Sequence, residues 1–110
     1  MKIRSITAEV KNLKLEHPYS IAYNTANSAQ VVFVTIKTDE GLTGLGSAGP
    51  DENVTKETAE SILENISGVV EPLLVGHDPL SYRAHLGKLA RELPFSPSAR
   101  AAVDIALHDL

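Results

Sequence analysis

The chain has 110 residues, of which 43% are hydrophobic and 22% are charged, and its formal net charge is -4. This balance is typical of one globular domain and excludes a disordered chain. The sequence contains no cysteine, which excludes a disulfide scaffold, a thiol nucleophile and a thiolate metal site. The acidic charge argues against nucleic acid as a partner. Because we find no signal-peptide core and no apolar run that could cross a bilayer, we expect a cytoplasmic protein that does not bind membranes.

The first half of the chain shows the two-residue alternation of β-strands. Residues 2–15 alternate between apolar and polar side chains, which predicts a first strand. Residues 30–38 are rich in β-branched residues and apolar on both sides, which is typical of a central strand. A hairpin loop at 39–41, with Gly41 for the positive-φ position, leads to a third strand over 42–47. We therefore predict a three-stranded antiparallel meander.

The second half of the chain shows helical spacing of apolar residues instead. The spacing predicts helices over residues 56–75, 79–93 and 97–110, and Thr55 is the expected N-cap of the first helix. The expected fold class is therefore α+β, with the meander followed by a three-helix bundle in one domain, residues 1–110.

Proline and glycine set the expected limits of these helices. Pro72 is expected to break or bend the first helix, and Gly76 to end it. The pairs Asp78-Pro79 and Ser96-Pro97 are typical starts for the second and third helices. The inward face of the second helix is expected to consist of Tyr82, Leu86, Leu89, Ala90 and Leu93.

The third helix is apolar on more than one side. Its main stripe comprises Ala99, Ala102, Val103, Ala106, Leu107 and Leu110. Ala101 and Ile105 lie on another side, so we expect this helix to need a second packing partner. The periodicity continues to Leu110 without a stop signal, and we therefore expect the sequence to belong to a longer one.

Residues that could carry chemistry mostly have simpler interpretations. Gly41, Gly44 and Gly46 do not have the spacing of a phosphate loop, and we interpret them as hairpin and strand glycines. None of the four histidines pairs at metal-ligand spacing, so we predict no metal site and assign the histidines to surface or helix-end roles.

The charged residues of the helical half and of the loop before it are also interpreted as structural or solvent-exposed. Arg100, Asp104 and His108 share one helix face, as a charge ladder or, in the alternative interpretation, as a proton relay. Asp51 and Glu52 are adjacent loop carboxylates that are expected to point into water. A solvated helix face is expected from Glu57, Glu60 and Glu64. We identify no catalytic residue.

Two loops have the composition of binding loops. Residues 16–29 are long for a hairpin connection and contain Tyr19, Ile21 and Tyr23. Residues 47–54 join the sheet to the first helix. In the alternative interpretation, Tyr19 and Tyr23 only cover the edge of the core.

Four segments carry a family resemblance that extends over essentially all 110 residues. They are the loop entry His17-Pro18-Tyr19, the strand pair Val31 to Gly46, the junction Gly76-His77-Asp78-Pro79 and the helix Ser98 to Leu110. In this order they resemble the N-terminal capping domain of the enolase superfamily, of the mandelate racemase and muconate-lactonizing type, in its dipeptide-epimerase branch.

The resemblance implies a full-length enzyme in which a (β/α)-barrel follows this domain and packs with it. In that family the barrel holds Mg²⁺ and the lysines that remove a proton next to a carboxylate, so this chain alone would hold no catalytic or metal-binding residue. The parent would be a dipeptide epimerase or a cycloisomerase, and a homo-oligomer. The two loops would close over a small carboxylate substrate. This places the substrate-binding residues at Tyr19, Ile21, Asn24, Thr25 and Val54.

Two positions depart from the family pattern. Epimerases of acidic dipeptides often carry arginine where this chain has Asn24, which argues against an alanyl-glutamate substrate. Glutamate often follows the Gly-x-Gly of the family, and here Ser47 stands instead. The alternative function is a stand-alone binding or interaction module without catalysis.

Overall fold

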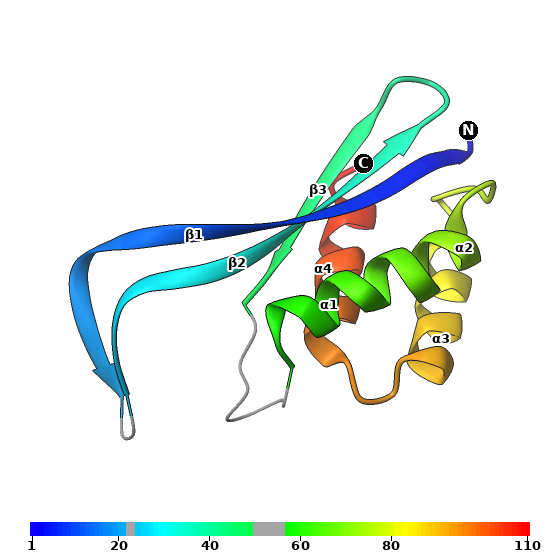
Figure 1. Cartoon of the computed structure of the whole chain (residues 1–110). Helices are drawn as coiled ribbons and strands as arrows, with labels where there is room; N and C mark the ends of the chain where they lie inside the picture. The colour runs from blue at the N-terminus through cyan, green and yellow to red at the C-terminus, as the bar shows by residue number, and fades with distance from the viewer. Residues whose placement is uncertain (22–23, 50–56) are drawn as a thin grey trace.

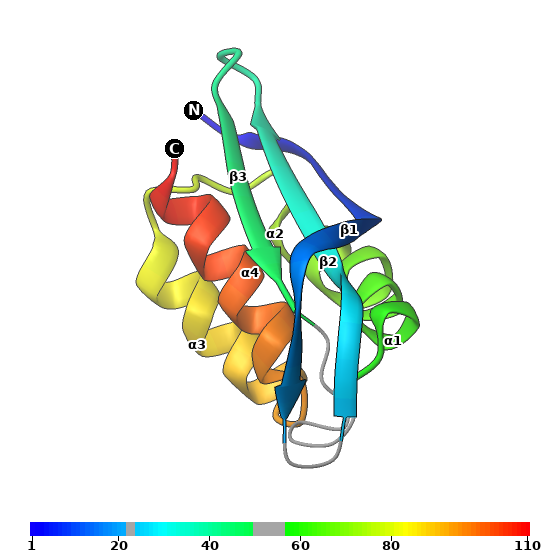
Figure 2. The ribbon, with the colours of Figure 1, turned by 90° about the vertical axis from the view of Figure 1, so that its left-hand side faces the viewer.

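The computed structural model describes residues 1–21, 24–49 and 57–110, and for residues 12–21 and 24–29 it describes the backbone alone. It shows three antiparallel strands followed by helices that lie along one face of the sheet (Figure 1). The expected α+β class is therefore confirmed. The same view turned by 90° shows the sheet as one layer and the helices as a second layer behind it (Figure 2).

The sheet has the predicted meander order. Strand β1 (Ile3–Ile21) pairs with β2 (Asn24–Thr38), and β2 pairs with β3 (Thr43–Ala48), so that β2 is central. Residues of β2 with even numbers from Val32 to Thr38 are buried against the helices, because side chains alternate between the two faces of a strand. The turn between β2 and β3 uses Gly41 at a φ of 84°, as the sequence predicted.

The prediction of a long loop over residues 16–29 is wrong. The two strands continue through most of this segment, and Tyr19 pairs with Ala26 near its far end. The pairing register shifts between Lys14 and Tyr19. Pro18 lies in this stretch, and because proline has no amide hydrogen, it cannot donate a hydrogen bond to the neighbouring strand. Because of this interruption, the two-residue alternation typical of a strand could not be recognised in the sequence. Figure 1 shows the hairpin bending and extending away from the helices.

The first helix begins later than predicted. Helix α1 spans Ala59–Asn65, and its N-cap is Thr58 rather than Thr55, which lies outside the described residues. The Thr58 hydroxyl accepts a hydrogen bond from the Ser61 amide at 3.0 Å, and the Ser61 hydroxyl accepts one from the Thr58 amide at 2.9 Å. This reciprocal pair is a capping box in which serine replaces the usual glutamate.

Pro72 distorts the helix without ending it. A π-helical segment, η1 (Ile66–Val70), connects α1 to α2 (Glu71–Leu74), and the Glu71 amide donates to the Ile66 carbonyl five residues earlier. The widened turn directly precedes Pro72, which has no amide hydrogen and whose ring crowds the preceding turn. The helix ends beyond Leu74, and Gly76 follows with a φ of 90°, in agreement with the predicted stop.

Helix α3 (Tyr82–Glu92) begins three residues after the predicted Pro79. The Asp78 carboxylate accepts a hydrogen bond from the Leu80 amide at 2.9 Å, which stabilises a turn instead of a helix start. The predicted inward face is partly wrong, because Tyr82 and Ala90 are exposed whereas His85 is buried.

Helix α4 (Pro97–His108) begins at the predicted Ser96-Pro97 pair and packs directly on β3. A Cβ atom added at Gly46 would collide with the Ala102 carbonyl oxygen and lie 2.9 Å from the Ala106 nitrogen, and one at Gly44 would collide with the Ala106 carbonyl. Gly44 and Gly46 therefore let the helix backbone approach the strand backbone, which confirms their interpretation as strand glycines.

One contiguous core lies between the sheet and the helices. Its fully buried large side chains are Ile3, Ile6, Val32, Val34, Ile36, Ile62, Ile66, Val70, Leu74, Leu89 and Val103. The predicted stripe of α4 contributes to this core, with Ala99, Ala102, Val103, Ala106 and Leu107 all buried. In the described part of the chain, no helix has the length and apolar character needed to cross a membrane.

Candidate functional site

The far end of the β1–β2 hairpin brings most of the predicted substrate-binding residues together. Ile21 pairs with Asn24, and Tyr19 lies two residues before Ile21 on the same strand. Opposed residues and residues two apart belong to the same face of an antiparallel pair, so Tyr19, Ile21 and Asn24 share one face. Thr25 pairs with Ser20 and belongs to the other face.

The second predicted loop is described only at its two ends. Ser47 and Ala48 belong to β3, and Gly49 follows them, whereas Val54 lies outside the described residues. The connection re-enters the described structure at Glu57, directly before the N-cap of α1. Nothing in the structure therefore tests Val54 as a binding residue.

The described ends of the two connections lie toward one end of the molecule. The far end of the hairpin and the C-terminal end of β3 point away from the β2–β3 turn in both views (Figure 1, Figure 2). The N-terminal ends of α1 and α4 lie toward this same end.

The exit of the second connection is anchored by a buried carboxylate. Glu57 is 3% exposed, and its two oxygens accept hydrogen bonds from the backbone amides of Ser98 at 2.9 Å and Ala99 at 3.2 Å. These amides belong to the first turn of α4, where no helical partner exists for them. The expected position of Glu57 on a solvated helix face is therefore wrong.

Sequence reasoning missed Glu57 because its role depends on a distant segment. The residues around it signal only a helix start. Its partners follow about forty residues later, and local spacing carries no information about that contact. One signal in the sequence was available: the first turn of α4 contains no acidic residue of its own, so its free amides would favour a carboxylate from another segment.

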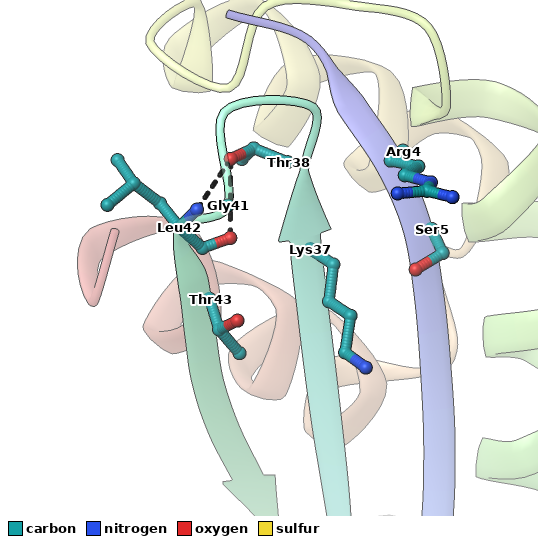
Figure 3. A pocket seen from close by; sticks show the side chains of 7 residues that line it. All are labelled: Arg4, Ser5, Lys37, Thr38, Gly41, Leu42 and Thr43. Atoms are coloured by element: carbon teal, nitrogen blue, oxygen red, sulfur yellow. Dashed lines mark hydrogen bonds between the residues drawn. The ribbon is translucent and has the colours of Figure 1, made fainter.

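A pocket of about 500 Å³ lies at the opposite end of the sheet, beside the β2–β3 turn. It is lined by residues that include Arg4, Lys37 and Thr38 (Figure 3). The Thr38 hydroxyl is already occupied, because it accepts from the Leu42 amide at 3.1 Å and donates to the Leu42 carbonyl at 3.3 Å. Arg4 and Lys37 are exposed, so the pocket offers no enclosed reacting group.

The described residues do not form a metal centre. No group of three histidine, cysteine, aspartate or glutamate side chains within residues 1–11, 30–49 and 57–110 could hold a metal ion. Of the two expected roles, surface or helix end, His85 has the second: it is 2% exposed in the first turn of α3, and its Nε2 lies 2.8 Å from the Asp78 carbonyl oxygen. Since a carbonyl can only accept, Nε2 carries the hydrogen. His85 therefore joins α3 to the turn before it.

The predicted charge ladder of Arg100, Asp104 and His108 is formed only in part among the described residues, between Asp104 and His108. Nδ1 of His108 lies 2.8 Å from Oδ1 of Asp104, and both side chains are about half exposed. The His108 ring also contacts Tyr82, with ring centroids 4.8 Å apart. Ion pairs with this exposure contribute little to stability, and water would exchange protons with them directly.

The arrangement agrees with one protein family over almost the whole chain. The family described as "Mandelate racemase / muconate lactonizing enzyme, N-terminal domain" matches residues 3–110. The chain belongs to this family. It corresponds to the N-terminal domain of enolase-superfamily enzymes, which confirms the resemblance seen in the sequence.

Two relatives illustrate the range of this family. The domain is 44% identical over 110 residues to an L-Lys-D/L-Arg epimerase from Desulforapulum autotrophicum, covering 100% of the chain and 31% of that protein. It is 34% identical over 112 aligned residues to a chloromuconate cycloisomerase from a Pseudomonas species, covering 100% of the chain and 30% of that protein.

A solved structure gives the same match in three dimensions. The dipeptide epimerase from Methylococcus capsulatus, complexed with Mg and the dipeptide L-Arg-D-Lys, superposes with a TM-score of 0.90 at 37% identity. The alignment covers 98% of this domain and 30% of that chain. The domain thus spans about a third of the length of its relatives, which are epimerases, racemases and cycloisomerases.

Proposed function

We propose that this domain caps the substrate and selects it in a Mg²⁺-dependent dipeptide epimerase. The observation that carries the proposal is the 44% identity to an L-Lys-D/L-Arg epimerase over the whole domain. The geometry supports it, because the far end of the β1–β2 hairpin, the C-terminal end of β3 and the N-terminal end of α1 lie toward one end of the fold. A pair of segments held there by a rigid sheet is suited to closing over a ligand on a neighbouring domain.

The proposed contact residues differ in their position on the hairpin. Tyr19, Ile21 and Asn24 belong to one face of the hairpin end, so we assign the substrate to that face. Thr25 belongs to the other face and would act through the backbone or through a neighbouring segment. Val54 would contribute from the second connection.

The charge of the two segments favours a cationic substrate. Residues 16–29 contain Glu16 and no lysine or arginine, and residues 47–54 contain Asp51 and Glu52 and no lysine or arginine. Three carboxylates without a cation attract a positively charged side chain and repel an acidic one. We infer a preference for dipeptides with lysine or arginine, as in the names of relatives at 44% and 38% identity.

The described residues do not fit a Mg²⁺ site, and we therefore assign the metal and the proton transfer to a C-terminal domain of the full-length protein. When bound there, Mg²⁺ would stabilise the charge that develops on a substrate carboxylate. This domain would exclude water and orient the side chains of the dipeptide.

The test follows deuterium entering the α-position of dipeptides. The full-length protein is incubated in D₂O with Mg²⁺ and matched L,L-dipeptides that carry cationic, apolar or acidic side chains, and loss of the α-proton signal is followed by NMR. We expect exchange that is fastest for cationic dipeptides and is abolished by a chelator. Equal rates for cationic and acidic dipeptides would remove the charge argument, and no exchange for any dipeptide would reject the epimerase.

The isolated 110-residue domain provides the control. We expect it to cause no exchange at any Mg²⁺ concentration, since the reacting groups are assigned to the other domain. A stand-alone binding module would behave differently, because it would bind its ligand with the same affinity in the isolated and full-length forms. Calorimetry of both forms with a cationic dipeptide separates the two functions.

A further inference from the structure

Strand β1 contains an extra residue where it passes the end of β2. Ile3 pairs with Thr38 and Ser5 pairs with Lys37, so Arg4 has no opposed residue on β2 and forms a bulge. Ile3 is 1% exposed and faces the core, whereas Arg4 directly after it is exposed. Because a bulge changes the direction of the side chains around it, Arg4 and Ser5 both lie on the face of the sheet away from the helices.

The bulge completes a row of hydrogen-bond donors across the three strands. Ser5 pairs with Lys37, and Lys37 pairs with Thr43. Opposed residues of antiparallel strands lie on the same face, so these three side chains form one row. Figure 3 shows Arg4 and Ser5 on β1, Lys37 on β2 and Thr43 on β3, and all four line the pocket of about 500 Å³. The pocket thus combines a guanidinium, an ammonium and two hydroxyl groups.

The two positive charges of the pocket are not neutralised by the described residues. None of the described residues that line the pocket is an aspartate or a glutamate. On the same face, Lys11 forms an ion pair with Glu9 at 3.7 Å, whereas Arg4 and Lys37 form none within the described part of the chain. Asp39, in the neighbouring turn, accepts a hydrogen bond from a backbone amide at 2.9 Å. Two cations that line one pocket repel each other, and a bound anion would offset that repulsion.

We propose that the bulge pocket, defined as Arg4, Ser5, Lys37 and Thr43, binds a phosphoryl group. Such a group carries a charge of about -2 and three acceptor oxygens, which matches two cations and two hydroxyl donors better than a single carboxylate does. The guanidinium of Arg4 can donate two parallel hydrogen bonds, and Lys37 provides a point charge. The group belongs either to free phosphate or to a small phosphorylated molecule, for which the volume of the pocket is sufficient.

Amine labelling of the full-length protein tests this site without an activity measurement. An N-hydroxysuccinimide ester is added at increasing concentrations of inorganic phosphate, and mass spectrometry follows the modification of each lysine. Sodium chloride keeps the ionic strength constant, and a chelator prevents phosphate from binding through a metal ion. Lys37 reports on the pocket. Lys11 is the internal control, because it is exposed on the same face and does not line the pocket.

We expect phosphate to slow the labelling of Lys37, about fivefold at a concentration of about four times Kd, and to leave Lys11 unchanged. Arg4→Gln should remove most of this protection. Arg83→Gln should retain it, because it removes the same charge from an exposed position on α3. Equal slowing of Lys37 and Lys11 would indicate general screening and overturn the proposal, and so would protection that persists in Arg4→Gln.

Two further ligands identify the chemistry of the bound group. Malonate carries two carboxylates, and protection by malonate at the same or a lower concentration than by phosphate would overturn the assignment of a phosphoryl group. Glycerol 3-phosphate carries the phosphoryl group on a small molecule. If it protects Lys37 at a lower concentration than inorganic phosphate does, the pocket binds a phosphorylated small molecule, and the reverse order assigns it to free phosphate.

Discussion

The carboxylate of Glu57 accepts a hydrogen bond from the backbone amide of Ser98, at 2.9 Å, across 41 residues of sequence. Its second oxygen accepts from Ala99 at 3.2 Å. A negative charge at the N-terminus of a helix satisfies free amides and interacts favourably with the helix dipole. One side chain thus joins the end of the second connection to the helix that packs on β3.

Glu57→Gln is expected to destabilise the domain by about 1–3 kcal/mol, because a buried charged hydrogen bond is lost and the amide group opposes one of the two backbone donors. The measurement is urea unfolding followed by circular dichroism. Glu60→Gln is the control, since Glu60 is exposed on α1, and it should change stability by less than about 0.5 kcal/mol. Equal effects of the two variants would contradict a capping role for Glu57.

Gly46→Ala tests the close approach of α4 to β3. The added methyl group would meet the Ala102 carbonyl, so the helix must move away, and we expect a loss of about 1–3 kcal/mol. Gly68→Ala is the matched control, because nothing lies within 4 Å of its Cβ position and alanine favours a helix. The domain carrying Gly68→Ala should unfold at the same or higher urea concentration. A Gly46→Ala domain of wild-type stability would show that the layers are not in backbone contact.

His85→Leu is expected to cost about 1–3 kcal/mol, because the hydrogen bond from the buried ring to the Asp78 carbonyl is lost and that carbonyl keeps only the Ser81 amide, at 3.2 Å, as a donor. His77 offers a comparison, since its ring lies 6.0 Å from that of His85 but its side chain is exposed. His77→Leu should leave the thermal unfolding midpoint almost unchanged. If both leucine variants unfold at the wild-type temperature, the His85 hydrogen bond contributes nothing to the stability of the domain.

Asn24→Arg tests the specificity assigned to the hairpin end. In the full-length protein, a guanidinium at this position should favour dipeptides with acidic side chains and weaken turnover of cationic ones. We expect the ratio of kcat/KM between the two classes to change by about tenfold, which corresponds to about 1.4 kcal/mol. Thr25→Arg is the control on the opposite face of the hairpin. The same shift from both variants would mean that general charge, and not position, sets the preference.

Local patterns in the sequence were sufficient to predict the fold class. The apolar run of residues 30–38 identified the central strand of the sheet. A strand with apolar side chains on both faces is typical of the middle of a sheet, where it is paired on both edges. Gly41 correctly predicted a turn, and Ser96-Pro97 correctly predicted a helix start. Both predictions succeeded because these residues restrict or extend the conformations that their own backbone can adopt. The family resemblance also rested on segments that can be read in order along the chain.

Tertiary structure decided the features that depend on distant partners. Residues 16–29 form most of a strand pair although their composition is typical of a loop, because each strand pairs with the other across the register shift near Pro18. The glycines at 44 and 46 gain their role only from the helix that packs on them. Glu57 is buried because the N-terminus of α4 provides two free amides that donate hydrogen bonds to its carboxylate. The sequence around Glu57 does not show which distant segment will pack against it.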